Sequence, residues 1–148
     1  MKQKHMIIMI TAVAIGIAAY FLIFYDGYSG TFELSLNGLK YNMELTEFKR
    51  IKASDGVLYS ADFSDGDNNV QLTFKIWEDN GEAYISLSNP TLTLDGTEYY
   101  MQHPLRNNEY FVDALLDNYI WITFLNPPMN NKCYLSGRFI IEGSNLIN

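Results

Sequence analysis

Four of the six Asn-Gly and Asp-Gly pairs in this sequence restrict its possible folds more than any other feature. They are Asn37-Gly38, Asp65-Gly66, Asn80-Gly81 and Asp95-Gly96. Both residues of such a pair adopt positive φ easily, so the pair is typical of the two-residue turn of a β-hairpin. The chain is therefore expected to fold into antiparallel strands joined by tight turns.

The side chains that each turn would bring together support this interpretation. One face of every hairpin is then apolar, with Leu34 opposite Tyr41, Ala61 opposite Val70, Tyr59 opposite Leu72, Ile76 opposite Ile85, and Leu92 opposite Tyr99. A shift by one residue would move all side chains of a strand to the other face. Agreement at four turns is therefore much stronger evidence than agreement at one.

The resulting prediction is a mostly β domain with about nine strands. The strands are expected at 31–36, 39–45, 57–64, 69–78, 82–88, 91–95, 97–102, 119–126 and 132–142. Segment 46–56 is expected to be a longer connection or a ragged strand. Nine strands with one apolar face favour an antiparallel β-sandwich, with a small barrel as the alternative.

One segment, 109–117, has the spacing of a short helix. Asn108 can cap it, and its apolar residues would then face inward: Phe111, Val112, Leu115 and Leu116. Its acidic residues would form an outward stripe at four-residue spacing: Glu109, Asp113 and Asp117. This stripe is a candidate contact surface or simply a solvated face.

The segment from Met6 to Tyr25 contains no charged residue and predicts a transmembrane helix. Twenty residues of helix extend about 30 Å, the thickness of a bilayer's hydrocarbon core. The alternative is a cleaved secretory signal, because Lys2 and Lys4 precede the segment and Gly16-Ile17-Ala18 offers a small-residue cleavage site. The apolar run continues to Tyr25, which favours an uncleaved anchor.

The predicted organisation follows from the anchor. Residues 1–5 form a cytoplasmic tail, 6–25 the membrane span, 26–30 a short linker, and 31–148 the β domain. Lysines precede the span and Asp26 follows it, so the positive-inside rule places the β domain outside the cytoplasm. The expected location is the cell inner membrane, with the domain periplasmic or extracellular.

The part of the chain beyond the span is strongly acidic. All 17 acidic residues follow residue 25, with eight of the 10 basic residues, so this part carries a formal charge of −9. Such a charge repels nucleic acid and anionic lipid, and it favours encounter with basic partners. We expect a protein partner, with basic character, and no nucleic acid.

The residues that usually carry catalysis or bind metal are few. His103 is the only histidine beyond the span, Cys133 is the only cysteine, and no Gly-x-Ser-x-Gly motif occurs. Segment 65–69 resembles the start of a calcium loop, but it lacks the later glycine and the closing glutamate. We expect no enzyme activity, no metal site and no cofactor.

Aromatic residues make up 15% of the chain, and strand alternation turns some of them away from the apolar face. Trp77, Tyr84 and Tyr100 point either outward or toward a second layer. If they are exposed, they suit a protein interface or a sugar-binding face. The functional hypotheses are a protein-binding inhibitor or immunity-type factor, an accessory subunit of an envelope assembly, and a glycan-binding module.

Overall fold

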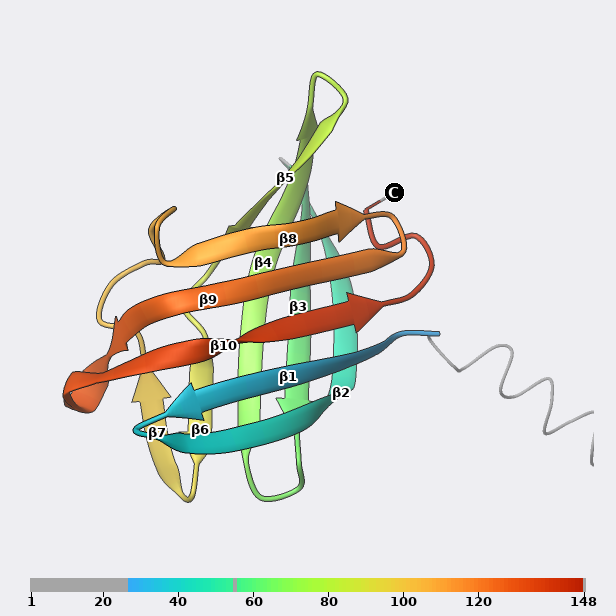
Figure 1. Cartoon of the computed structure of the whole chain (residues 1–148). Helices are drawn as coiled ribbons and strands as arrows, with labels where there is room; N and C mark the ends of the chain where they lie inside the picture. The colour runs from blue at the N-terminus through green and yellow to red at the C-terminus, as the bar shows by residue number, and fades with distance from the viewer. Residues whose placement is uncertain (1–26, 55, 148) are drawn as a thin grey trace, which may run out of the picture.

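The computed structural model describes residues 27–54 and 56–147, which form an antiparallel β structure (Figure 1). Ten strands lie in this part of the chain, with one short 3-10 helix, η1 (Asn130–Lys132). The strands are β1 (Ser29–Leu36), β2 (Leu39–Ala53), β3 (Gly56–Ser64), β4 (Asn69–Asp79), β5 (Glu82–Leu87), β6 (Thr91–Leu94), β7 (Thr97–Tyr100), β8 (Tyr110–Leu116), β9 (Tyr119–Met129) and β10 (Cys133–Glu142).

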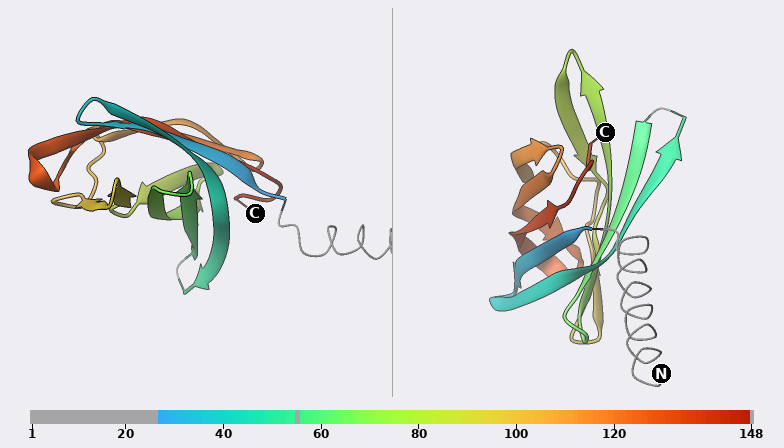
Figure 2. Two further views of the ribbon diagram at one scale, coloured as in Figure 1. Left: turned by 90° about the horizontal axis from the view of Figure 1, so that it is seen from below. Right: turned by 90° about the vertical axis from the view of Figure 1, so that its right-hand side faces the viewer.

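These strands form one sheet that folds over on itself into two layers. Its order is β7-β6-β4-β3-β2-β1-β10-β9-β8, and β5 pairs with the far half of β4. In Figure 2 the strands β1, β10, β9 and β8 form one layer, β3 to β7 form the other, and β2 curves from one to the other. The prediction of mostly antiparallel β structure is confirmed, and the arrangement is sandwich-like.

Of the two expectations for 46–56, a longer connection or a ragged strand, the structure supports the strand, because β2 continues to Ala53. The first part of β2 pairs with β1 up to Glu44, and its second part pairs with β3 from Glu44 to Ala53. A bulge between Leu45 and Glu47 lies where the strand changes layers. A bulge bends a strand and increases its twist, so β2 can bridge the layers without a loop.

The core fills the space between the two layers. Phe32 stacks on Phe124 and on Phe139 of the same layer at centroid distances of 5.7 and 6.1 Å. The Phe139 ring also contacts Phe124, and Phe74 of the other layer, in tilted arrangements at 6.1 Å. Tyr59 and Phe74 stack at 5.2 Å. Offset and edge contacts of this kind add to the burial energy of the rings.

Three of the four hairpin registers are confirmed. Leu34 lies opposite Tyr41, Ile76 opposite Ile85, and Leu92 opposite Tyr99. At the Asp65-Gly66 turn the predicted register is wrong by two residues, because Ala61 lies opposite Leu72 and not Val70. A shift of two keeps the same side chains on the same face, so the core is unaffected.

The β3–β4 hairpin has a longer turn than predicted, because Asp65 begins a four-residue loop. Its Oδ1 accepts the N–H groups of Asp67 and Asn68 at 3.0 and 2.8 Å, and its Oδ2 accepts the Asn68 side-chain amide at 2.9 Å. Asn68 Oδ1 in turn accepts the Asp95 N–H at 2.7 Å. The carboxylate thus fixes this loop, and Asn68 ties it to the β6–β7 turn.

The predicted helix over 109–117 is wrong, because Tyr110–Leu116 forms strand β8. The helical spacing of the apolar residues competes here with hairpin pairing, and the pairing with β9 forms hydrogen bonds along one edge of the segment. A bulge between Val112 and Ala114 breaks the strict alternation that would have revealed a strand. β8 is therefore the one strand of the ten that was not among the nine predicted.

The predicted membrane anchor at residues 6–25 lies outside the described residues. Within 27–54 and 56–147, no helix has the length and apolar character needed to cross a membrane.

Gly137 of β10 gives a test of how tightly β1 and β10 approach. A Cβ atom at this position would collide with the Glu33 carbonyl oxygen and lie 2.8 Å from Leu34 Cα, both backbone atoms of β1. Gly137→Ala should therefore lower the free energy of unfolding by about 2 kcal/mol, measured by urea denaturation. Ser136→Ala in the same strand is the matched control, and equal stability of the two variants would contradict this packing.

The Asp65 loop gives a test by pH. Hydrogen bonds from Asn68 lower the pKa of Asp65 from its usual 3.8. Because folding lowers this pKa, the stability that the carboxylate contributes is present well above pH 3.8 and is lost as the pH falls through the lower, folded-state value. Urea denaturation should show Asp65→Asn to be less stable than the wild type at pH 7, with the difference shrinking in acid. A difference that stays constant down to acid unfolding would argue against this role.

Candidate protein-binding site

Trp77 and Tyr84 lie together on a projecting hairpin, which we call the β4–β5 arm (residues 77–84). β3 pairs with β4 only as far as Ile76, so the arm beyond it is a two-stranded ribbon. Figures 1 and 2 show this ribbon extending past the rest of the sheet. The Trp77 and Tyr84 rings stack at a centroid distance of 5.8 Å and an angle of 19°, and they are 39% and 41% exposed. The second layer therefore leaves both rings accessible.

The β4–β5 arm is also acidic. Between Trp77 and Tyr84 the sequence holds Glu78, Asp79 and Glu82 and no basic residue. The Tyr84 hydroxyl donates to Glu82 Oε2 at 3.0 Å, and this hydrogen bond raises the pKa of Tyr84. The arm thus presents a flat aromatic surface beside carboxylates, an arrangement that suits a cationic or guanidinium group of a partner.

Tyr100, the third predicted aromatic residue, is exposed but lies elsewhere. It ends β7 and is 51% exposed. Figure 1 shows β7 and the tip of the β4–β5 hairpin at opposite ends of the molecule. The structure therefore joins Trp77 with Tyr84 and leaves Tyr100 outside this surface.

The predicted acidic stripe is absent, because its members lie in different environments. Glu109 is only 8% exposed, while Asp113 and Asp117 are exposed. Asp113 Oδ2 accepts the Thr123 hydroxyl at 2.5 Å, and Asp117 Oδ1 lies 3.4 Å from the Ile147 amide nitrogen that donates to it. The helical spacing that grouped the three residues does not exist in a strand.

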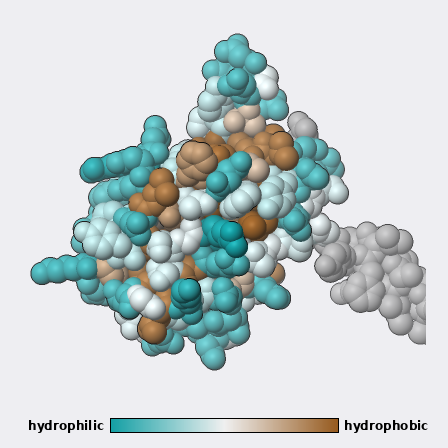
Figure 3. All heavy atoms as spheres, in the orientation of Figure 1, coloured by the Kyte–Doolittle hydropathy of each residue, from teal (hydrophilic) through white to brown (hydrophobic). Residues whose placement is uncertain are grey.

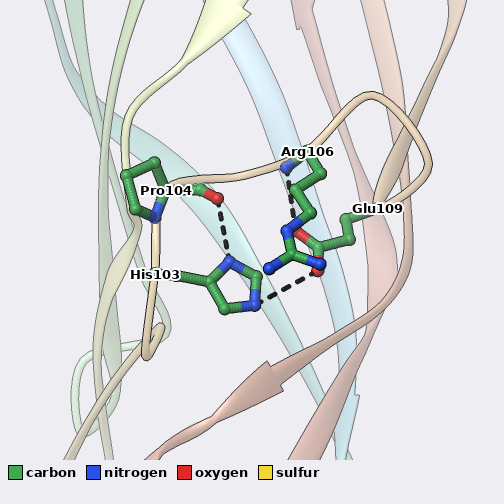
Figure 4. A network of polar contacts seen from close by, with 4 residues as sticks. All are labelled: His103, Pro104, Arg106 and Glu109. Carbon is green, nitrogen blue, oxygen red and sulfur yellow. Dashed lines mark hydrogen bonds and ion pairs between the residues drawn. The ribbon is translucent and has the colours of Figure 1, made fainter.

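Glu109 instead holds the loop before β8 in place. Its Oε2 accepts the Arg106 N–H at 2.8 Å, and its Oε1 lies 3.5 Å from His103 Nε2 (Figure 4). His103 Nδ1 is 2.9 Å from the Pro104 carbonyl oxygen. No pattern in the sequence indicates that this glutamate is buried, since it stands between Asn108 and Tyr110 at the edge of a polar loop.

β8 exposes apolar side chains that were expected to face inward. Phe111, Val112 and Leu116 are 58%, 38% and 56% exposed. β8 is the last strand of the sheet order, so β9 covers only one of its edges. Figure 3 shows apolar atoms gathered over this part of the molecule. This surface was missed because the helix prediction placed these residues in the core.

A shallow hollow of about 450 Å³ lies on the outer face of the other strands of this layer. Its lining includes Trp121 beside polar side chains from four strands, among them Glu33, Lys40 and Arg138. Arg138 Nε donates to Glu33 Oε2 at 2.9 Å, so two of the charges in its lining are paired with each other. The hollow offers hydrogen-bonding groups beside the ring of Trp121.

The described residues contain no group of three or more histidine, cysteine or acidic side chains placed to hold a metal ion. In the segment that resembles the start of a calcium loop, the Asp65 carboxylate accepts hydrogen bonds from Asn68 of the same loop. Cys133 is buried, its Sγ–H donates to the Asn130 carbonyl oxygen at 3.1 Å, and burial raises the pKa of its thiol. A raised pKa reduces the thiolate fraction and with it the reactivity of the thiol.

No protein-family model matches this chain, and comparisons with curated proteins and with solved structures found no significant match.

The buried Glu109 carboxylate gives a stability test. Glu109→Ala removes the acceptor of the Arg106 N–H and the partner of His103 and should lower the free energy of unfolding by about 2 kcal/mol, measured by urea denaturation at pH 7. Glu98→Ala, at an exposed acidic residue of β7, should change it by less than about 0.5 kcal/mol. Equal effects of the two changes would remove the assigned role of Glu109.

Proposed function

We propose that this protein is a non-enzymatic, membrane-tethered protein whose acidic β domain binds another protein, with an inhibitory or immunity-type role. The observation that supports the proposal best is the β4–β5 arm, which holds two stacked, half-exposed aromatic rings and three acidic residues, of which Glu82 accepts a hydrogen bond from the Tyr84 hydroxyl. Tryptophan and tyrosine dominate the binding energy of many protein interfaces.

The geometry of the arm favours a protein partner over a small molecule. The aromatic pair lies on a ribbon that projects from the sheet, so a partner with a cleft can contact it from more than one side. Small-molecule sites are usually concave and bury most of their ligand. A projecting surface instead suits insertion into the concave surface of another macromolecule.

Charge supports a basic partner. The chain beyond residue 25 carries a formal charge of −9, and the arm contributes Glu78, Asp79 and Glu82 to it. Opposite charges raise association rates and select partners, and this effect weakens as salt is added. A basic envelope enzyme or toxin is a partner of the required kind.

The proposed tether would keep binding close to a membrane. β1 begins at Ser29, only a few residues after the predicted span ends at Tyr25. A linker this short leaves the domain little freedom to move away from the bilayer. Partners in the envelope would thus be met at high effective concentration.

Capture experiments with the full-length chain test the proposal. Affinity capture from an envelope extract should retain a basic protein, and Trp77→Ala or Tyr84→Ala should reduce the amount by at least about tenfold, since each removes a ring of the stacked pair. Salt of about 0.5 M should also release the partner.

Tyr100→Ala is the matched control, because Tyr100 is as exposed as the paired rings but lies on β7. It should leave capture unchanged. If loss of Tyr100 weakens capture as much as loss of Trp77, the arm is not the binding surface. If the chain retains no protein under any condition, the proposed function itself is wrong.

A further inference from the structure

The two ends of the sheet differ in how their edges are protected. At the β7 end, the Asn130 side chain behaves like a piece of strand: its Oδ1 accepts the Tyr100 N–H at 3.0 Å and its Nδ2 donates to the Glu98 carbonyl oxygen at 3.3 Å. At the other end, the order of the sheet stops at β8, and the described residues place no strand beyond it. Natural proteins usually cover or charge such an edge, because it pairs readily with another chain.

The unpaired backbone groups of β8 can be located from the register. The Leu125 N–H donates to the Glu109 carbonyl oxygen at 2.8 Å, so these two residues form a hydrogen-bonded pair. The next pair along the ladder is Tyr110 with Phe124. Hydrogen-bonded and non-hydrogen-bonded pairs alternate along an antiparallel ladder. The N–H and C=O groups of Tyr110 and Val112 therefore point away from β9.

Side chains beside this edge offer contacts for an added strand. Phe111 and Leu116 are more than half exposed and Val112 is 38% exposed. A hollow of about 310 Å³, lined by Asn107, Tyr110, Phe111 and Val112, lies at the start of the strand. In strand addition, backbone hydrogen bonds supply affinity and such hollows select alternate side chains.

The charge of the edge indicates what kind of strand fits. Asp113 lies in the middle of β8 and is exposed, and Asp117 follows the strand. If a second copy of β8 paired antiparallel about Asp113, the two Asp113 carboxylates would lie opposite each other, and like charges directly opposite destabilise a strand pair. A strand with lysine or arginine opposite Asp113 meets no such repulsion.

We propose that the free edge of β8 takes up an extended segment of the partner protein, in which basic residues alternate with apolar ones, as an added antiparallel strand. This inference rests on the proposed function, because it names the part of a basic partner that one surface of the domain would bind. It concerns a different surface from the β4–β5 arm.

A peptide of seven residues, the length of β8, tests the proposal directly. Fluorescently labelled peptide that alternates valine with lysine is titrated against the full-length protein and followed by anisotropy. The same peptide N-methylated at every backbone nitrogen has the same charge but has no N–H to donate along either edge, and a valine–glutamate peptide reverses the charge. We expect the first peptide to bind at least tenfold more tightly than either of the other two.

Two variants test whether the peptide binds along β8. Val112→Pro removes an N–H that points away from β9 and should abolish binding, while thermal unfolding shows whether the fold is kept. Asp113→Lys should reverse the preference between the lysine and glutamate peptides, and this reversal does not depend on tolerance of a proline. Tyr100→Ala is the matched control and should leave peptide binding unchanged, because Tyr100 is exposed at the end of β7, away from β8.

Several outcomes would overturn the inference. Equal binding of the N-methylated peptide would mean that charge alone attracts it, and an unchanged preference in Asp113→Lys would place it elsewhere. Self-association of the wild type that Val112→Pro abolishes would show that a second copy occupies the edge. If Val112→Pro and Asp113→Lys both capture the partner as well as the wild type while Trp77→Ala does not, the proposed function stands and the inference about β8 fails.

Discussion

The structure depends on β2 being shared by both layers. Glu44 lies opposite Thr31 of β1 on one side and opposite Ser64 of β3 on the other, so a single strand carries the hydrogen bonding from one layer into the next. The bulge after Leu45 bends it there. Because the layers are joined by a continuous strand, their apolar faces meet without a long connection, and the arm and the free edge of β8 are held in one body.

Most of the fold could be predicted because hairpin turns and strand alternation are local properties of the sequence. The turn at Asn80-Gly81 fixed the positions of Trp77 and Tyr84 opposite each other, as observed. The turn at Asp65-Gly66 could not be assigned correctly, since its length depends on how the Asp65 carboxylate is shared with Asn68. The prediction for segment 109–117 failed for a different reason: its apolar residues fit helical spacing, and only pairing with β9 makes it a strand.

The candidate surfaces show the same division between local and tertiary information. Exposure of Trp77 and Tyr84 depends on the parity of two strands and on the absence of a covering layer over the arm, of which only the parity can be read from the sequence. Burial of Glu109 and exposure of Phe111 both depend on where the sheet ends. Nothing in the sequence near residue 110 indicates that β8 is the last strand.

The isolation of the β4–β5 arm has a consequence for its dynamics. A two-stranded ribbon without further neighbours is marginally stable in water, and beyond Ile76 the arm has only its own two strands. Its amides should therefore exchange with solvent through local opening, well before the rest of the domain unfolds. A partner that grips the aromatic pair would then order the ribbon, so part of the binding free energy is spent on conformational entropy.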